Sequence, residues 1–102
     1  MDMKKMMKQA QKMQRDAAAA QEEIASMTFE ASAGGGMVKA TATGEMAITE
    51  IVIDPAAVDP EDVEMLQDMV CVAVNEALRA ASEAANARMS AVMGGMKIPG
   101  LM

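Results

Sequence analysis

Residues 60–93 read PEDVEMLQDMVCVAVNEALRAASEAANARMSAVM and predict one long helix. Asp59 suits the N-cap, Pro60 suits the first helical position, and Gly94-Gly95 supplies a stop. Glycine and proline are absent between Glu61 and Met93. At a rise of about 1.5 Å per residue the helix would be roughly 50 Å long. That length is large for a chain of 102 residues, so the other elements are expected to arrange themselves along it.

Apolar side chains occupy most sides of this predicted helix. Positions 63, 66, 70, 73 and 77 alternate in steps of three and four, and Met65, Met69 and Val72 add a second apolar set. A helix that is apolar on most sides must be covered on most sides. The rest of the chain looks too small for this, so we expect a homodimer in which a second copy supplies the cover. The expected dimer contacts are Val63, Leu66, Met69, Val70, Ala73 and Ala77.

The composition predicts a single domain with a thin core. Phe29 is the only aromatic residue, and the apolar content is mainly Ala, Val, Ile, Leu and Met. Small side chains fill little volume, so stability should depend on oligomerisation. Cys71 is the only cysteine, which fits a reducing compartment. Neither a signal peptide nor an apolar run of membrane-spanning length is evident, and we expect a cytoplasmic protein.

Charge is distributed unevenly along the chain. The net charge of −6 argues against nucleic acid as a partner. The first 20 residues nevertheless carry five basic residues against Asp2 and Asp16, and most of the acidic residues come later. The N-terminal segment is therefore a basic arm on an acidic body. Its basic residues are Lys4, Lys5, Lys8, Lys12 and Arg15.

Residues 1–27 predict a first helix with a coiled-coil-like seam. Its apolar residues keep the three-four alternation, and the basic residues fall on positions away from that seam. The helix should bind protein with one face and expose basic charge on the other. The seam comprises Met3, Met6, Ala10, Met13, Ala17, Ala20, Ile24 and Met27.

The middle of the chain predicts three strands, at residues 28–33, 37–43 and 47–53. Gly34-Gly35-Gly36 and Gly44-Glu45 provide the two turns. Val38, Ala40 and Ala42 should face one side of the sheet, and Ile51 and Ile53 should face inward. The fold class is α+β, an α-β-β-β-α chain with an antiparallel meander and two long helices. Residues 1–93 would form the domain, and residues 94–102 a flexible tail.

Catalytic and metal chemistry find little support in the sequence. Histidine is absent, and the serines lack a base, so an enzyme is not expected. Helix capping accounts for the acidic cluster at residues 59–64, and the three glycines lack the Gly-Lys-Ser/Thr of a phosphate loop. Cys71 is expected to be a buried, inert thiol, and Asn75 would face either the sheet or a partner chain. We expect no cofactor, no metal and no small-molecule substrate.

Four stretches, in this order, resemble the YbaB/EbfC family of bacterial nucleoid-associated proteins. They are MKQAQKMQ at residues 7–14, GMVKATATG at 36–44, IVIDP at 51–55, and EML through NEA across 64–77. The resemblance implies a tweezer-like homodimer that binds DNA, alters its conformation and contributes to nucleoid organisation and gene regulation. By position it makes the five basic residues of the arm candidate phosphate contacts. At Thr49-Glu50, where many relatives are basic, this chain is not.

Other interpretations remain open at this point. The basic arm would also serve as a solvated helix face that keeps the protein soluble. A dimeric protein-interaction module without nucleic-acid binding is the main alternative, and the acidic total favours it. Attachment of the Met/Lys-rich first helix to an anionic membrane is a third, weaker possibility. The nucleic-acid interpretation predicts weakly specific binding of duplex DNA through phosphates.

Overall fold

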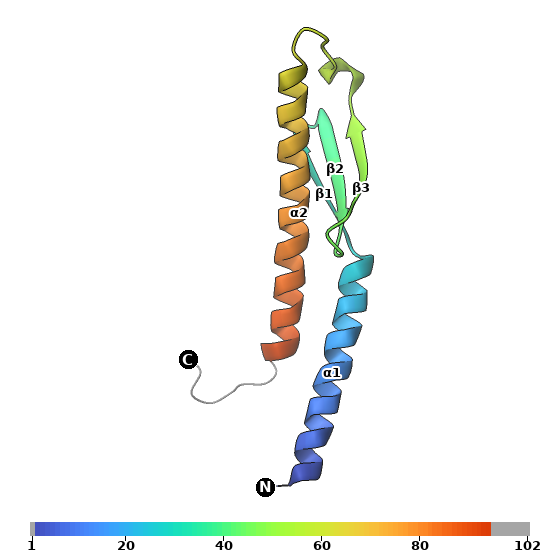
Figure 1. Cartoon of the computed structure of the whole chain (residues 1–102), viewed down its shortest axis with the longest axis vertical. Coiled ribbons are helices and arrows are strands. Elements are labelled where there is room, and N and C mark those ends of the chain that lie inside the picture. Colours follow the sequence, from blue (N-terminus) through green and yellow to red (C-terminus); the bar gives the residue numbers. More distant parts are fainter. Residues whose placement is uncertain (1, 95–102) are drawn as a thin grey trace.

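The computed structural model describes residues 2–94 and confirms the α-β-β-β-α order (Figure 1). The expected flexible tail lies outside the described residues apart from Gly94, which ends the last helix. All three strands begin and end within one residue of the expected positions. The elements are α1 (Met3–Ser26), β1 (Thr28–Ala33), β2 (Val38–Thr43), β3 (Ile48–Ile53), the 3-10 turn η1 (Pro55–Ala57) and α2 (Val63–Gly94).

The sheet is an antiparallel meander in the order β1-β2-β3, and α2 lies across one of its faces. Val38, Ala40 and Ala42 of β2 share one face of the sheet, as the alternation predicts, and the structure shows that this face is fully buried. They pack against Ala73, Ala77 and Ala81 of α2. Because most of these side chains are alanine, the helix backbone can lie close to the sheet. The core is therefore thin, as the composition predicts.

Strand β3 directs its isoleucines as expected but does not bury them. Ile53 pairs with Val38 and Ile51 pairs with Ala40, so both isoleucines share the face of the sheet on which α2 packs. They nevertheless remain 37% and 43% exposed. The reason is that α2 packs over β1 and β2 and leaves β3 uncovered. The outer edge of the sheet is thus apolar and faces solvent in the single chain.

Helix α2 begins at Val63, three residues later than predicted. The Oδ1 of Asp59 accepts a hydrogen bond from the Glu61 N–H at 2.9 Å, which closes a turn before the helix. The Oδ1 of Asp62 accepts from the Met65 N–H at 3.2 Å, which is the geometry of an N-cap. Asp59 and Asp62 are both suitable N-cap residues, and Asp62 is the one that caps α2.

Glycines are required where β2 ends and where the first hairpin turns. Gly34, Gly35 and Gly36 all have positive φ, a conformation that is strained for other residues. Gly44 lies against the carbonyl of Ile24, and its N–H donates to the Met27 carbonyl at 3.2 Å. This close approach fixes the end of α1 beside the second hairpin.

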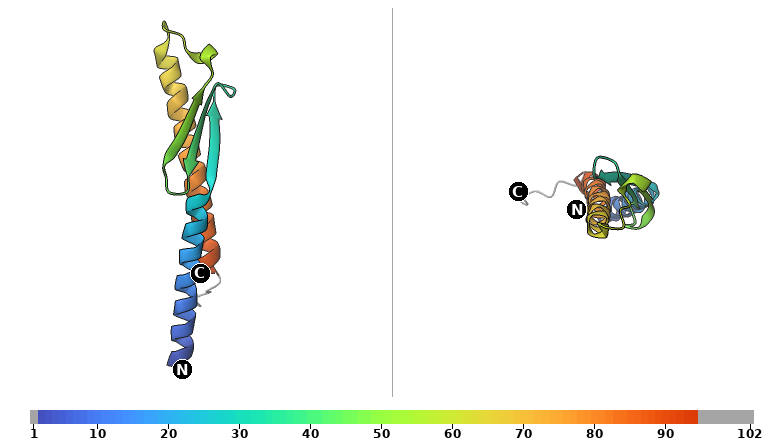
Figure 2. Two further views of the ribbon diagram at one scale, coloured as in Figure 1. Left: turned by 90° about the vertical axis from the view of Figure 1, so that its right-hand side faces the viewer. Right: turned by 90° about the horizontal axis from the view of Figure 1, so that it is seen from above.

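The chain is elongated, with extents of 71 × 27 × 16 Å. Helix α1 continues beyond the end of the sheet and runs beside the C-terminal half of α2 (Figure 2). The two helices are antiparallel, and an ion pair of 2.6 Å between Arg88 and Glu23 joins them. The sheet and the start of α2 therefore lie at one end of the molecule, and the N-terminus of α1 lies at the other.

Candidate nucleic-acid interface

The basic residues of α1 form one continuous surface, here called the cationic face. With 3.6 residues per turn, their positions fall within an arc of roughly 100° around the helix. All of them are exposed. Asp2 caps the helix, since its Oδ1 accepts a hydrogen bond from the Lys4 N–H at 3.1 Å. The cationic face comprises Lys4, Lys5, Lys8, Lys12 and Arg15.

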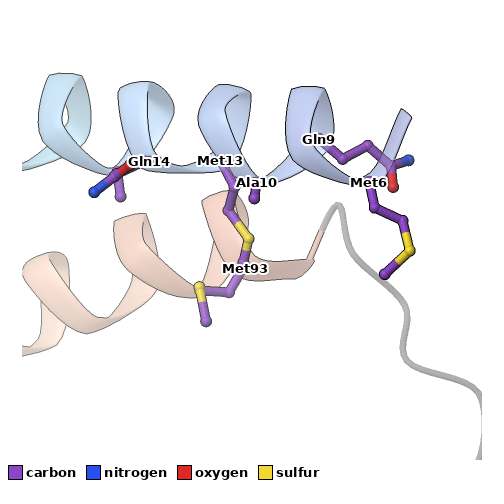
Figure 3. A pocket seen from close by; sticks show the side chains of 7 residues that line it. Met6, Gln9, Ala10, Met13, Gln14 and Met93 are labelled. Carbon is purple, nitrogen blue, oxygen red and sulfur yellow. The ribbon is translucent and has the colours of Figure 1, made fainter. Parts of the chain in front are cut away.

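The opposite side of α1 is apolar and turns toward α2. Ala20 and Ile24 are almost fully buried, with 2% and 5% of their surface exposed. Further toward the N-terminus, Met13 and Met93 line a shallow groove between the two helices (Figure 3). Packing against α2 therefore fixes the rotation of α1 about its axis, and it directs the cationic face away from the body.

The cations of this face are not neutralised within residues 2–94, where no carboxylate forms an ion pair with any of them. By contrast, Arg79 binds Glu76 and Glu83 at 2.7 Å each. The hydrogen bond and the charge of Arg79 lower the pKa of Glu76 below its ordinary value. Arg79 thus stabilises its own helix and Arg88 pairs with Glu23, whereas the basic residues of the cationic face are free to bind an anion.

Acidic residues gather at the other end of the molecule. They come from the segment after β3 and from the first turns of α2, at Asp54, Asp59, Glu61, Asp62, Glu64 and Asp68. Asp54 caps η1, with its Oδ1 accepting from the Ala56 N–H at 2.9 Å. Among the described residues, no group of three or more His, Cys, Asp or Glu side chains is arranged to hold a metal. Capping accounts for Asp54 and Asp62, and closure of a turn accounts for Asp59.

The residues expected to form the dimer contact differ in how far they are buried within the single chain. Ala73 and Ala77 are fully buried by the sheet of the same chain, so they offer no surface to a second copy. Leu66, Met69 and Val70 are partly buried against that core, and Val63 is half exposed. The face that was expected to need a partner chain is thus covered largely from within.

Two further residues of α2 were singled out in the sequence, and the structure places both on its surface. Cys71 is exposed rather than buried, because its side of α2 faces away from the sheet. Asn75 is also exposed and therefore does not face the sheet. An apolar surface that sequence reasoning missed is the β3 edge, which we define as Ile51, Val52 and Ile53. Alternation along the strand indicates only that Val52 faces the opposite side from Ile51 and Ile53, and the fold is needed to show that all three are exposed.

Comparison with known proteins identifies the family of this chain. The model of the YbaB/EbfC DNA-binding family matches residues 1–96. The chain belongs to the YbaB/EbfC DNA-binding family.

Relatives agree with the YbaB/EbfC assignment over nearly the whole length. A nucleoid-associated protein of Acetivibrio thermocellus is 58% identical over 97 residues, covering 94% of this chain and 86% of the relative. One from Pelotomaculum thermopropionicum is 54% identical over 100 residues, covering 98% and 95%. These descriptions are of nucleoid-associated proteins and not of enzymes.

The fold of this YbaB/EbfC chain is also seen in a solved structure. The uncharacterized protein HP0035 from Helicobacter pylori superposes with a TM-score of 0.77 at 22% identity. The match covers 92% of this chain and 99% of that one. At this identity the likeness establishes the fold alone. Within the described residues, neither helix is long and apolar enough to cross a lipid bilayer.

Proposed function

We propose that this chain is a nucleoid-associated protein that binds duplex DNA through the cationic face of α1. The observation that carries the proposal is the arrangement of five exposed cations on one side of a helix, with none neutralised by a carboxylate of residues 2–94. Binding by such a face releases counterions from the phosphate backbone. Family membership and the names of the relatives support the same partner.

The side-chain chemistry of this face favours phosphate contacts over reading of bases. Four of its five residues are lysines, which act as point charges and not as bidentate readers of base edges. Phe29, the only aromatic residue, lies in β1 and packs against the core, so it is not available to stack on bases. Low sequence specificity follows from this chemistry. As a DNA-binding protein of this kind, the chain would be located on the nucleoid in the cytoplasm.

A homodimer would double the number of cations that meet one DNA molecule. We place its contact at the β3 edge, because this strand presents unpaired backbone groups and three exposed apolar side chains. Val63, half exposed at the start of α2, is the member of the expected set that keeps the most surface for this contact. Two arms of α1 on one body would then grip or bend the duplex.

The proposal is tested by fluorescence anisotropy of a labelled duplex across a salt series, with two duplexes of unrelated sequence. We expect similar affinities for both and a linear fall of log K with log salt, with a slope of about −0.9 for each phosphate contacted. Size-exclusion chromatography with light scattering on the same sample establishes that the protein is a folded dimer. Failure of a folded dimer to bind at low salt would refute the proposal.

A protein-interaction module without nucleic-acid binding is the second candidate. The net charge of −6 and the acidic end of the molecule favour it. The same salt series separates the two, because an interaction module would leave the anisotropy of the duplex unchanged at every salt concentration.

A further inference from the structure

Three methionines gather on one side of the first turns of α1. Met6 and Met7 follow Met3 by three and four residues, which places both of them beside it on one face of the helix. Together with Ala10 they line a shallow hollow at the surface. Since the side chain of alanine carries no heteroatom, the three thioether sulfurs are the side-chain donors of this hollow.

Packing among residues 2–94 does not explain these side chains. The sequence places Met3 and Met6 in an apolar seam, where methionine ordinarily fills gaps between other side chains. In the structure Met3, Met6 and Met7 are 73%, 52% and 59% exposed. The end of α2 covers the seam further along, where Met93 lines one groove with Met13 (Figure 3). The cluster at the start of α1 is therefore accessible to a ligand from solution.

The chemistry of the cluster selects one class of ligand. Thioether sulfur is a soft, neutral donor, and soft sulfur ligands favour Cu(I) over hard ions such as Mg²⁺. Histidine is absent from the chain, so imidazole does not compete for the ion. We propose that Met3, Met6 and Met7 bind a soft monovalent ion, Cu(I), through their three sulfurs. This site revises the expectation from the sequence that no metal is bound, and it does not depend on DNA binding.

The geometry of the helix allows the three sulfurs to reach one ion. Residues three and four apart on a helix have Cβ atoms about 5–6 Å from each other. Each methionine has three rotatable side-chain bonds, so the sulfurs can converge by rotation while the backbone stays in place. Because these side chains are exposed, no packed neighbour has to move when they turn inward.

The lysines of α1 do not occupy the site. With 3.6 residues per turn, the centre of the methionine cluster lies about 160° around the helix from the centre of the cationic face. The nearest lysine, Lys4, is about 60° from Met7. Asp2 caps the helix, and its carboxylate offsets the positive end of the helix dipole. A monovalent ion is also repelled less than a divalent one by the charges that remain.

NMR of the full-length protein, labelled with ¹³C at the methionine methyl groups, provides the first test. Cys71 is replaced by serine, because an exposed thiol would compete for a soft ion. Silver(I) is the probe, since it is soft and monovalent like Cu(I) and is stable in air. We expect the methyl signals of Met3, Met6 and Met7 to shift together and to saturate at one ion per chain, and Mg²⁺ to shift none of them. Shifts at every exposed methionine alike, or saturation at one ion for two chains, would overturn the proposal.

Removal of the sulfurs without loss of apolar volume provides the second test. In the Cys71→Ser background, Met3→Leu is combined with Met7→Leu, because leucine matches methionine in size but offers no donor. The matched control combines Met46→Leu with Met65→Leu, at residues that are 44% and 60% exposed and lie in separate parts of the chain. We expect the affinity for silver(I), measured by calorimetry, to fall at least about tenfold in the first variant and to stay unchanged in the control. Equal affinities in the two variants would refute the site.

Competition with bicinchoninate, a chelator that reports Cu(I) by its colour, identifies the ion. The measurement uses the same three proteins under anaerobic conditions, which keep copper reduced. We expect the parent and the control to withdraw Cu(I) from the chelator and the variant at positions 3 and 7 to withdraw at least about tenfold less. Failure of the parent protein to compete would contradict the assignment of Cu(I), even if silver(I) binds.

Discussion

The Nη2 atom of Arg88 lies 2.6 Å from Oε2 of Glu23, which joins the last turns of α2 to the last turns of α1. Both side chains are about half exposed. The pair lies next to Ile24, where the α1 seam becomes fully buried. It thus links the two helices at a place where solvent weakens its contribution to stability.

Glu23→Gln is expected to lower the free energy of unfolding by less than about 1 kcal/mol, because the ion pair is solvent-exposed. Urea denaturation at low and at high salt measures this, and the difference from wild type should shrink as salt rises. The exchanged pair Glu23→Arg with Arg88→Glu should recover most of the loss. A loss above about 2 kcal/mol would mean that the ion pair contributes more to the free energy of unfolding than its exposure implies.

Replacing Lys4, Lys5 and Lys8 by alanine should weaken DNA binding at least about tenfold and make the salt slope shallower by up to about three per chain. Folding should be preserved, since alanine is a strong helix former and all three side chains are exposed. Anisotropy and circular dichroism report the two effects. Lys39→Ala, on the sheet, is the matched control. An equal loss in the control would move the interface away from α1.

Ile51→Lys is expected to convert a dimer into a monomer, because it places charge on the exposed apolar edge of β3. Light scattering after size-exclusion chromatography measures the mass. Val72→Lys, at a comparably exposed position of α2, should leave the dimer intact. If instead Val72→Lys alone dissociates the dimer, its interface lies on the outer side of α2.

Gly44→Ala should be strongly destabilising, by about 2 kcal/mol or more, since the added Cβ would collide with the backbone carbonyl of Ile24. Gly35→Ala is the comparison. Its Cβ would meet open space, and only its φ of 68° is unfavourable, which costs about 1 kcal/mol. Thermal unfolding ranks the two variants, and the opposite ranking would show that the hairpin can move away from α1.

The carboxyl group of Glu76 should titrate below its ordinary pKa of about 4.5, because the carboxylate accepts a hydrogen bond from Arg79. A pKa that is lowered by folding contributes stability above the unfolded value, and this is lost as pH falls through the folded value. Carbon-detected NMR titration measures it. Arg79→Ala should return the pKa to its ordinary value, and an unshifted pKa in the wild type would indicate that the pair is not populated in solution.

Local patterns predicted the elements well. Two-residue alternation placed the strands and put Val38, Ala40 and Ala42 on one face of the sheet, and the three-four spacing identified both helices. Apart from the start of α2, the errors concern what covers an apolar face. Periodicity shows that Ala73 and Ala77 must be covered, but it does not show that the sheet of the same chain covers them.

The same limit explains why the exposure of Ile51 and Cys71 was not predicted. Whether either side chain is buried depends on how many strands α2 spans and on which side of the helix meets the sheet, and both are properties of tertiary packing. For the candidate site, the spacing of the lysines was sufficient to place them on one face of α1. The acidic end required the fold, because the turn between β3 and α2 places Asp54 and Asp68 at the same end of the molecule.

The separation of charge along the 71 Å axis has a consequence before any contact forms. With cations at one end and carboxylates at the other, the molecule is a permanent electric dipole. In the field of a polyanion it experiences a torque that turns α1 forward and the acidic end back. Encounters with DNA would then begin from one orientation, and the fraction that are productive would fall as added salt shortens the range of the field.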